Sequence, residues 1–185
     1  MSEGQTGLLL LLVVPVLWAL MWRGWRARTR RQVELPALPD APAARAEPVL
    51  GPIEAVYVSS TTAGDWLDRL VPHGLGERSA ATVWVHASTP GPANGVAGVL
   101  IARTGTSDVW IPAEALTAVR RDRGMAGKFV GPQGLVILTW SLGPAQLDTG
   151  LRTRYERDRD PLEQAVQGLI DDELGRPESK EDVSG

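Results

Sequence analysis

The sequence predicts a mainly β domain with a C-terminal helix, preceded by a membrane-spanning helix and a proline-rich linker. Three observations lead to this prediction. Residues 8–22 contain no charged side chain and are followed at once by arginines. Residues 53–154 form short apolar runs separated by turn residues, without the spacing of strand–helix–strand units, which favours an antiparallel sandwich or barrel. After residue 160 the apolar residues recur at helical spacing.

The apolar run begins at Leu8 and ends at Trp22, which is close to the shortest length that can cross a bilayer as a helix. Pro15 lies in its middle, and a single membrane helix tolerates such a proline when water or local 3₁₀ geometry satisfies the freed carbonyl. Trp18 and Trp22 lie toward the arginine end, where indole rings favour the headgroup region. We therefore predict a transmembrane helix.

The positive charges that follow this run predict its orientation. They are Arg23, Arg26, Arg28, Arg30 and Arg31. Because cytoplasmic flanks are rich in arginine and lysine, residues 1–31 are predicted to be a single-pass plasma-membrane anchor with its N-terminus outside and the rest of the chain in the cytoplasm. Two alternatives fit less well. A cleaved signal peptide would need basic residues before the run and small residues after it, but no lysine or arginine precedes the run, and tryptophan and arginine follow it. A buried helix of a soluble protein would not normally be apolar all round at the extreme terminus of the chain.

The remaining chain divides by composition into three parts. Residues 32–52 contain five prolines and are predicted to be an extended linker. Residues 53–175 are sufficient for one small domain with a hydrophobic core. Residues 176–185 are polar and acidic, and we expect them to be disordered. The chain has no cysteine, which excludes disulfides, thiol nucleophiles and thiolate metal sites.

The predicted strands follow from β-branched residues and alternating apolar positions between turn residues. They cover residues 53–62, 80–87, 96–103, 108–111, 117–123, 134–142 and 147–154. Residues 65–71 place their apolar side chains at helical spacing, which predicts a short helical turn. The chain therefore has about seven strands.

A helix is predicted after the last strand. Asp160 can cap its N-terminus, and Pro161 suits the first helical position. One apolar face follows, formed by Leu162, Ala165, Val166, Leu169 and Ile170. The helix is expected to stop near Gly175, shortly before Pro177.

Residues 110–119, WIPAEALTAV, resemble the middle of bacterial pleckstrin-homology-like (PH-like) and GRAM-type domains. A strand ends in Ile-Pro, one turn follows with Leu116 as its apolar anchor, and the next strand begins. The resemblance implies a strongly bent antiparallel barrel of seven strands that is closed at one end by a C-terminal helix. The predicted helix has the right place in the chain for that role.

The whole chain also resembles an actinobacterial family of single-pass proteins with one N-terminal anchor and a PH-like domain. Residues 120–128 (RRDRGMAGK), 135–140 (LVILTW) and 147–152 (LDTGLR) carry this resemblance. Members of that family are often described as transporters or export proteins and tend to be encoded beside pyrimidine-biosynthesis enzymes. The resemblance implies a membrane-bound protein, but the family has no established activity to transfer.

A search for catalytic or metal-binding patterns leads to no site. The two histidines, His73 and His86, stand in no metal-binding motif. The hydroxyl residues at 59–62 lack the glycine pattern of a nucleophile elbow. The GMAGK segment has neither the glycine spacing nor the Ser/Thr of a phosphate-binding loop. We therefore predict no catalytic residue, metal or cofactor, and no enzyme activity.

A basic group on a predicted hairpin is the candidate for binding an anion or a partner. It consists of Arg120, Arg121, Arg123 and Lys128. The neighbouring glycines would let backbone amides approach an anion, and guanidinium groups hold oxyanions bidentately. The alternative is a solvated hairpin of mixed charge, since Asp122 interrupts the run.

These observations predict a membrane-tethered cytoplasmic binding or scaffold module without catalytic activity. Its expected partners are the lipid bilayer and a cytoplasmic protein, and nucleic acid is not among them. One alternative is the binding of an anionic lipid or small anion through residues 120–128. Another is a role as an accessory subunit of a transporter.

Overall fold

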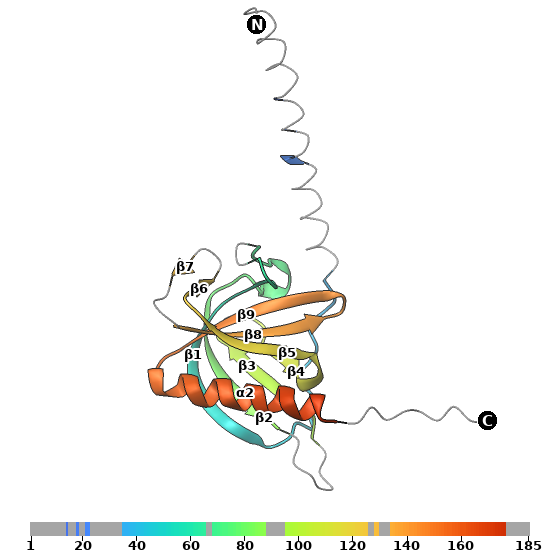
Figure 1. The fold of residues 1–185 in the computed structure, drawn as a ribbon, viewed down its shortest axis with the longest axis vertical. Helices are drawn as coiled ribbons and strands as arrows, with labels where there is room; N and C mark the ends of the chain where they lie inside the picture. The colour runs from blue at the N-terminus through green and yellow to red at the C-terminus, as the bar shows by residue number, and fades with distance from the viewer. Residues whose placement is uncertain are drawn as a thin grey trace, which may run out of the picture. The chain divides into compact units, whose positions relative to one another are not determined.

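The computed structural model describes residues 35–65, 68–87, 95–125, 128–129 and 134–176, together with Val14, Trp18, Met21 and Trp22. The chain divides into two units, Met1–Leu35 and Pro36–Gly185. Figure 1 shows the second unit as a curved sheet with one long helix packed against it.

In the first unit, Val14, Trp18, Met21 and Trp22 are helical. The rings of Trp18 and Trp22 pack edge to face with their centroids 4.9 Å apart. Within the part of the chain that the structure describes, no helix is both long and apolar enough to span a bilayer. Most of the predicted transmembrane run, including Leu8 and Pro15, and all five flanking arginines lie outside the described residues, so the membrane anchor stays a prediction.

The second unit is a seven-stranded sheet. Its strands are β1 (Pro48–Thr62), β2 (Ser79–His86), β3 (Gly98–Arg103), β4 (Val109–Pro112), β5 (Leu116–Asp122), β8 (Leu135–Leu142) and β9 (Ala145–Thr153). They lie in the order β4-β3-β2-β1-β9-β8-β5. Every neighbouring pair is antiparallel. A separate hairpin, β6 (Gly124–Met125) and β7 (Lys128–Phe129), follows β5.

The curvature of the sheet depends on β1, which is 15 residues long and pairs with β2 on one side and β9 on the other. Irregularities in both registers bend it. The 3₁₀ turn η2 (Ala113–Ala115) joins the two edge strands, β4 and β5. The helix α2 (Arg159–Leu174) contacts β1, β2, β5 and β8, so it bridges both halves of the sheet. The predictions of seven antiparallel strands and a C-terminal helix are therefore confirmed.

The core forms between the inner face of the sheet and the apolar stripe of α2. Burial alternates along β2, whereas consecutive residues are buried in β8 and β9. The predicted helix positions, apart from the half-buried Ala165, are removed from solvent, as their period-3.6 pattern requires. The helix buries Leu162, Val166, Leu169 and Ile170. The largest fully buried side chains of the sheet include Trp140, Tyr57, Ile101, Leu138 and Leu151.

A chain of hydrogen bonds crosses this core. The indole Nε1–H of Trp140 donates to Thr149 Oγ1 (2.9 Å), and the Tyr57 hydroxyl donates to the Leu75 carbonyl (2.9 Å). Between them, the Ser60 hydroxyl lies 2.6 Å from both Thr149 Oγ1 and the Tyr57 oxygen. Because the Tyr57 proton points to Leu75, Ser60 must donate to Tyr57 and Thr149 to Ser60. Burial raises the pKa of Tyr57 to about 12, although the hydrogen bond with Ser60 opposes this.

The predicted linker, residues 32–52, differs from the structure at its C-terminal end. β1 begins at Pro48, not at residue 53. Prolines are tolerated there because this part of β1 pairs with β2 only, and because Pro48 and Pro52 stand at the register irregularities. Ala46 is also buried, and its backbone N–H donates to the Val96 carbonyl, while the Val96 N–H donates to the Ala44 carbonyl. The predicted C-terminal boundary of the linker at residue 52 was therefore wrong, because residues 48–52 belong to β1.

The start of the helix also differs from the prediction. A 3₁₀ turn, η3 (Glu156–Asp158), leads directly into α2, so the helix begins at Arg159 with Asp158 at the N-cap. Asp160 therefore lies inside the first turn, and its carboxylate pairs with Arg121 instead of capping. Of the short turn predicted at 65–71, residues 66 and 67 lie outside the described residues, and Arg69 forms a β-bridge with Thr61.

Candidate functional site

Arg120, the first residue of the predicted basic site, is engaged by a buried carboxylate. It lies on β5, and its guanidinium forms two hydrogen bonds with Asp148 on β9, at 3.2 and 2.9 Å. It also donates to Thr139 Oγ1 on β8, between the two strands. This contact spans three adjacent strands and raises the pKa of Arg120.

Asp148 is 4% exposed and accepts hydrogen bonds from four donors. Besides the two from Arg120, they come from the Thr139 hydroxyl (2.7 Å) and the Gly64 backbone N–H (3.4 Å). Burial alone would raise the pKa of this carboxyl. The bonds from Arg120 and Thr139 outweigh burial and hold the pKa below its usual value. Arg120 and Asp148 therefore stabilise the sheet.

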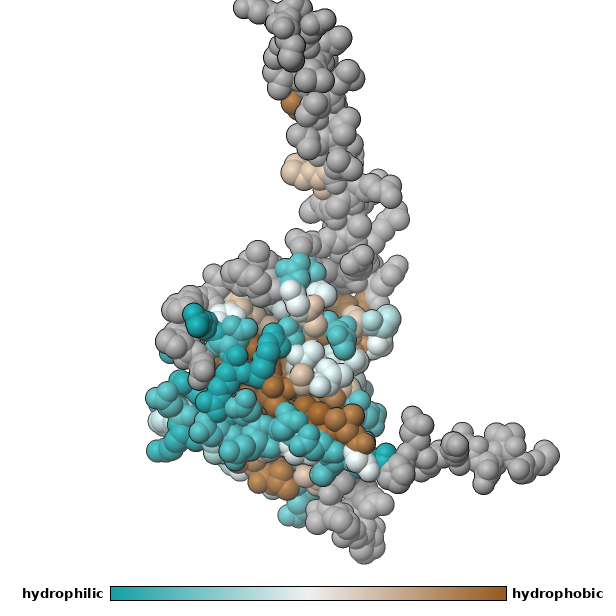
Figure 2. Space-filling model, viewed as in Figure 1, coloured by the Kyte–Doolittle hydropathy of each residue, from teal (hydrophilic) through white to brown (hydrophobic). Residues whose placement is uncertain are grey.

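Arg121 lies on the opposite face of β5 and joins the strand to α2. Its guanidinium pairs with Glu163 through Nε (2.6 Å) and with Asp160 through Nη2. Both carboxylates raise the pKa of Arg121. Figure 2 shows hydrophilic residues covering the face around the N-terminal half of α2. This arginine therefore holds α2 against the edge strand.

The other two predicted residues lie apart from this pair. The backbone N–H of Arg123 donates to Asp122 Oδ1 at 2.6 Å. Lys128 lies on β7, and its side chain is outside what the structure describes. The structure therefore does not bring Arg120 and Arg121 together as an anion site, since each already faces carboxylates on a different side of β5.

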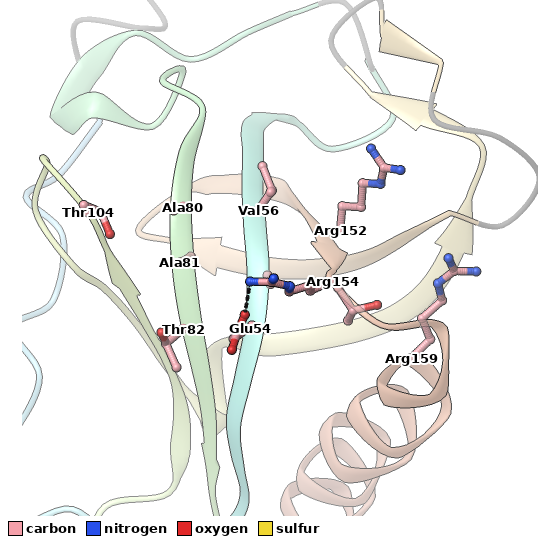
Figure 3. A pocket seen from close by; sticks show the side chains of 11 residues that line it. Glu54, Val56, Ala80, Ala81, Thr82, Thr104, Arg152, Arg154 and Arg159 are labelled. Atoms are coloured by element: carbon pink, nitrogen blue, oxygen red, sulfur yellow. Dashed lines mark hydrogen bonds and ion pairs between the residues drawn. The ribbon is translucent and has the colours of Figure 1, made fainter.

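A different surface carries a cavity. A trough of about 500 Å³ opens over β1, β2 and β9 and reaches the first residue of α2 (Figure 3). We call this surface the arginine trough. It is lined by Glu54, Ala55, Val56, Ala80, Ala81, Thr82, Thr104, Arg152, Thr153, Arg154 and Arg159. Three arginines thus face one glutamate in a protein whose net charge is −3.

Two of these arginines already hold carboxylates. Arg154 donates to Glu54 at 2.6 Å across β1, as Figure 3 shows, and this contact raises its pKa. Arg159 donates through Nη1 to Glu156 at 3.0 Å. The side chains of Glu54 and Glu156 are 57% and 86% exposed, and that of Arg154 is also exposed, whereas that of Arg159 is only 19% exposed. Exposed pairs of this kind contribute little to stability and exchange partners readily.

Two further groups of the trough arginines have no hydrogen-bond partner among the described residues. The Nε–H of Arg159 is buried and has no hydrogen-bond partner among the described residues. Arg152 is exposed on β9, and no hydrogen bond or ion pair joins its side chain to another described residue. In Figure 3, Arg152 and Arg159 lie on the same side of the trough, while Thr82 and Thr104 lie on the other.

The sequence analysis missed the arginine trough. One signal was available: Arg152 and Arg154 are separated by one residue in a predicted strand, so their side chains must share a face. No sequence pattern indicated that Arg159 lines the trough, because its position depends on where α2 begins. In the described part of the chain, no three His, Asp or Glu side chains are grouped as a metal site would require.

One comparison with known proteins identifies the domain. The family model described as "Bacterial PH domain-like" matches residues 35–167, most of the chain, including every strand of the sheet. No curated protein and no solved structure matches the chain. The PH-like resemblance seen at residues 110–119 is therefore confirmed, and the chain belongs to the bacterial PH domain-like family.

Proposed function

We propose that this protein is a binding module that recognises a partner protein through the arginine trough and performs no catalysis itself. The family supports a binding or scaffold role, since PH-like domains present their surfaces to ligands. The observation that carries the proposal is the trough itself: a cavity in which, among the described residues, two of the three arginines pair with exposed glutamates. Its floor consists of small side chains from β1 and β2, so a partner can approach the strands closely.

The proposal includes a membrane tether. The uncharged run from Leu8 to Trp22 and the arginines after it support a single helix at the plasma membrane with the domain in the cytoplasm. A tether would raise the local concentration of the domain near membrane-bound partners without a new contact. The proposed function is therefore that of a scaffold at the inner leaflet of the membrane.

The tether makes a prediction about topology. Protease added to intact spheroplasts should leave the PH-like domain undigested, because the membrane shields it. Permeabilised spheroplasts should lose it. The fragments can be followed by mass spectrometry with residues 95–125 as the reporter. Digestion of the domain in intact spheroplasts would show that it lies outside the membrane.

The binding surface makes a second prediction, which the variant Ala80→Trp tests. Ala80 is an exposed residue of the trough floor on β2, and tryptophan is well tolerated in strands but would fill the cavity. Tagged full-length protein is purified from native membranes in mild detergent. We expect the wild type to retain a stoichiometric partner and Ala80→Trp to lose it.

Ala118→Trp is the matched control. Ala118 is an exposed alanine on β5, outside the trough. The variant introduces the same side chain into another strand, and its thermal unfolding is compared with that of Ala80→Trp. Partner retention by Ala80→Trp, or equal loss in both variants, would contradict a role of the arginine trough.

A further inference from the structure

We infer that the arginine trough binds an extended acidic peptide segment of the partner protein, with carboxylates at alternate positions. This inference rests on the proposed function and adds the chemistry of the ligand. It follows from the spacing of the arginines, from the state of their present partners and from the shape of the floor.

The spacing comes from the end of β9: Arg152 lies on the strand, and Arg154 directly follows its last residue and still bonds to β1 through its backbone N–H, which donates to the Glu54 carbonyl (2.8 Å). Arg152 and Arg154 are exposed, whereas Leu151 and Thr153 between and beside them are buried. Alternate residues of a strand share one face and lie about 7 Å apart. An extended peptide presents its own alternate side chains at the same interval. Two carboxylates separated by one residue would therefore match the two guanidinium groups, whereas one small anion could not span both.

The residues that pair with the arginines in the structure show that these guanidinium groups bind carboxylates. Arg154 holds the carboxylate of Glu54, and Arg159 holds that of Glu156. Both glutamates are more than half exposed, so carboxylates of a peptide can replace them at the outer guanidinium nitrogens. Arg152 would gain acceptors that the described chain does not provide.

The floor of the trough suits an extended chain. Val56, Ala80 and Thr82 are small or β-branched residues, so the peptide backbone can lie close to β1 and β2. Thr82 and Thr104 border the side away from Arg152 and Arg159, where their hydroxyls can meet uncharged side chains. The charged and uncharged sides of the trough thus correspond to the two faces of an alternating peptide.

The experiment titrates ¹⁵N-labelled full-length protein in zwitterionic detergent micelles with synthetic peptides. The arginine Nε–H resonances in NMR spectra report binding directly. The probe is the peptide SESESES. ESSESSE has the same composition and charge, but no two of its glutamates are separated by a single residue. SQSQSQS has no glutamate. We expect saturable shifts of Arg152 and Arg159 with SESESES, binding about five-fold weaker with ESSESSE and none with SQSQSQS.

Single variants locate the site. Arg152→Gln and Arg159→Gln should each weaken SESESES binding about ten-fold, as expected for a lost hydrogen bond to a charged group. Arg159→Lys retains the charge without the planar fork and should fall between them and the wild type. Glu54→Gln should tighten binding several-fold, because it frees Arg154. Arg176→Gln, at the other end of α2, should change nothing.

Several results would overturn the inference. One is the absence of saturable shifts with SESESES. A second is equal affinity for SESESES and ESSESSE, and a third is a weakening by Arg176→Gln equal to that by Arg152→Gln; either indicates unspecific charge attraction. A fourth is binding of inorganic phosphate or of phosphatidylglycerol-doped micelles without peptide binding. If the peptides fail but Ala80→Trp still abolishes partner retention, the proposed function stands and only the peptide chemistry is wrong. If both fail, the trough is not the binding surface.

Discussion

Replacement of Trp140 by alanine is expected to destabilise the domain by about 4 kcal/mol, the range for deleting a large buried aromatic side chain. Trp140 is fully buried on β8. The cavity would lie in the centre of the core, and Thr149 would lose the indole as its donor. Urea unfolding followed by circular dichroism measures the change in free energy.

Two further variants separate the causes of this loss. Trp140→Phe retains much of the volume but removes the Nε1–H, and we expect a cost of about 1–2 kcal/mol from the unmet acceptor. Trp84→Ala is the matched control, because Trp84 is only half-buried on β2, and its cost should be clearly smaller. Similar losses for Trp84→Ala and Trp140→Ala would contradict the position of Trp140 as the core residue of the hydrogen-bonded chain.

The second large effect is expected from Asp148→Asn. The substitution removes the negative charge that faces Arg120 and should cost about 2 kcal/mol at neutral pH, the scale of hydrogen bonds to charged groups. Water screens the charge of Arg120, whose side chain is 44% exposed, and this screening limits the loss of stability. The same urea titration measures it, and Asp172→Asn on the exposed side of α2 is the control.

The pH dependence of this contribution has a defined sign. The folded chain holds the pKa of Asp148 below its usual value. Its stabilisation is therefore complete above the unfolded-state pKa of about 4 and is lost as the pH falls through the lower folded-state pKa. The stability difference between wild type and Asp148→Asn should thus shrink in acid. A difference that stays constant down to the acid unfolding transition would exclude a charged Asp148 in the native domain.

The local features of the fold were well predicted from the sequence. The alternation in residues 80–87 led to β2, the apolar run in residues 134–142 led to β8, and the spacing from Leu162 to Ile170 led to the buried face of α2. In β2 and α2 one face is buried, so the period of the buried residues reflects the backbone. In β8 the residues Leu135–Leu138 are all buried, and the length of the apolar run was the signal. The boundaries were less accurate. Pro48 can belong to β1 because this part of the strand pairs on only one side, and that pairing cannot be predicted from composition.

The candidate site, unlike the fold, was poorly predicted from the sequence. Arg120 and Arg121 stood out because they are adjacent basic residues, yet their charges are met by Asp148 and Glu163, which lie 28 and 42 positions away in the chain. Arg152 stood in a less basic segment and remained free of such a partner among the described residues. Which arginine a carboxylate occupies depends on strand order and helix placement, and neither is encoded locally.

The sequence by itself determined the strand and helix segments, the apolar N-terminal run and the membership of residues 35–167 in a PH-like family. Only the tertiary structure decided which charged side chains support the fold and which face a cavity. The physical reason is the separation along the chain of the residues that interact. Periodicity and turn chemistry act between neighbours in the chain, whereas the pairing of Arg120 with Asp148 and the meeting of Arg152 with Arg159 at one trough require the sheet to be complete.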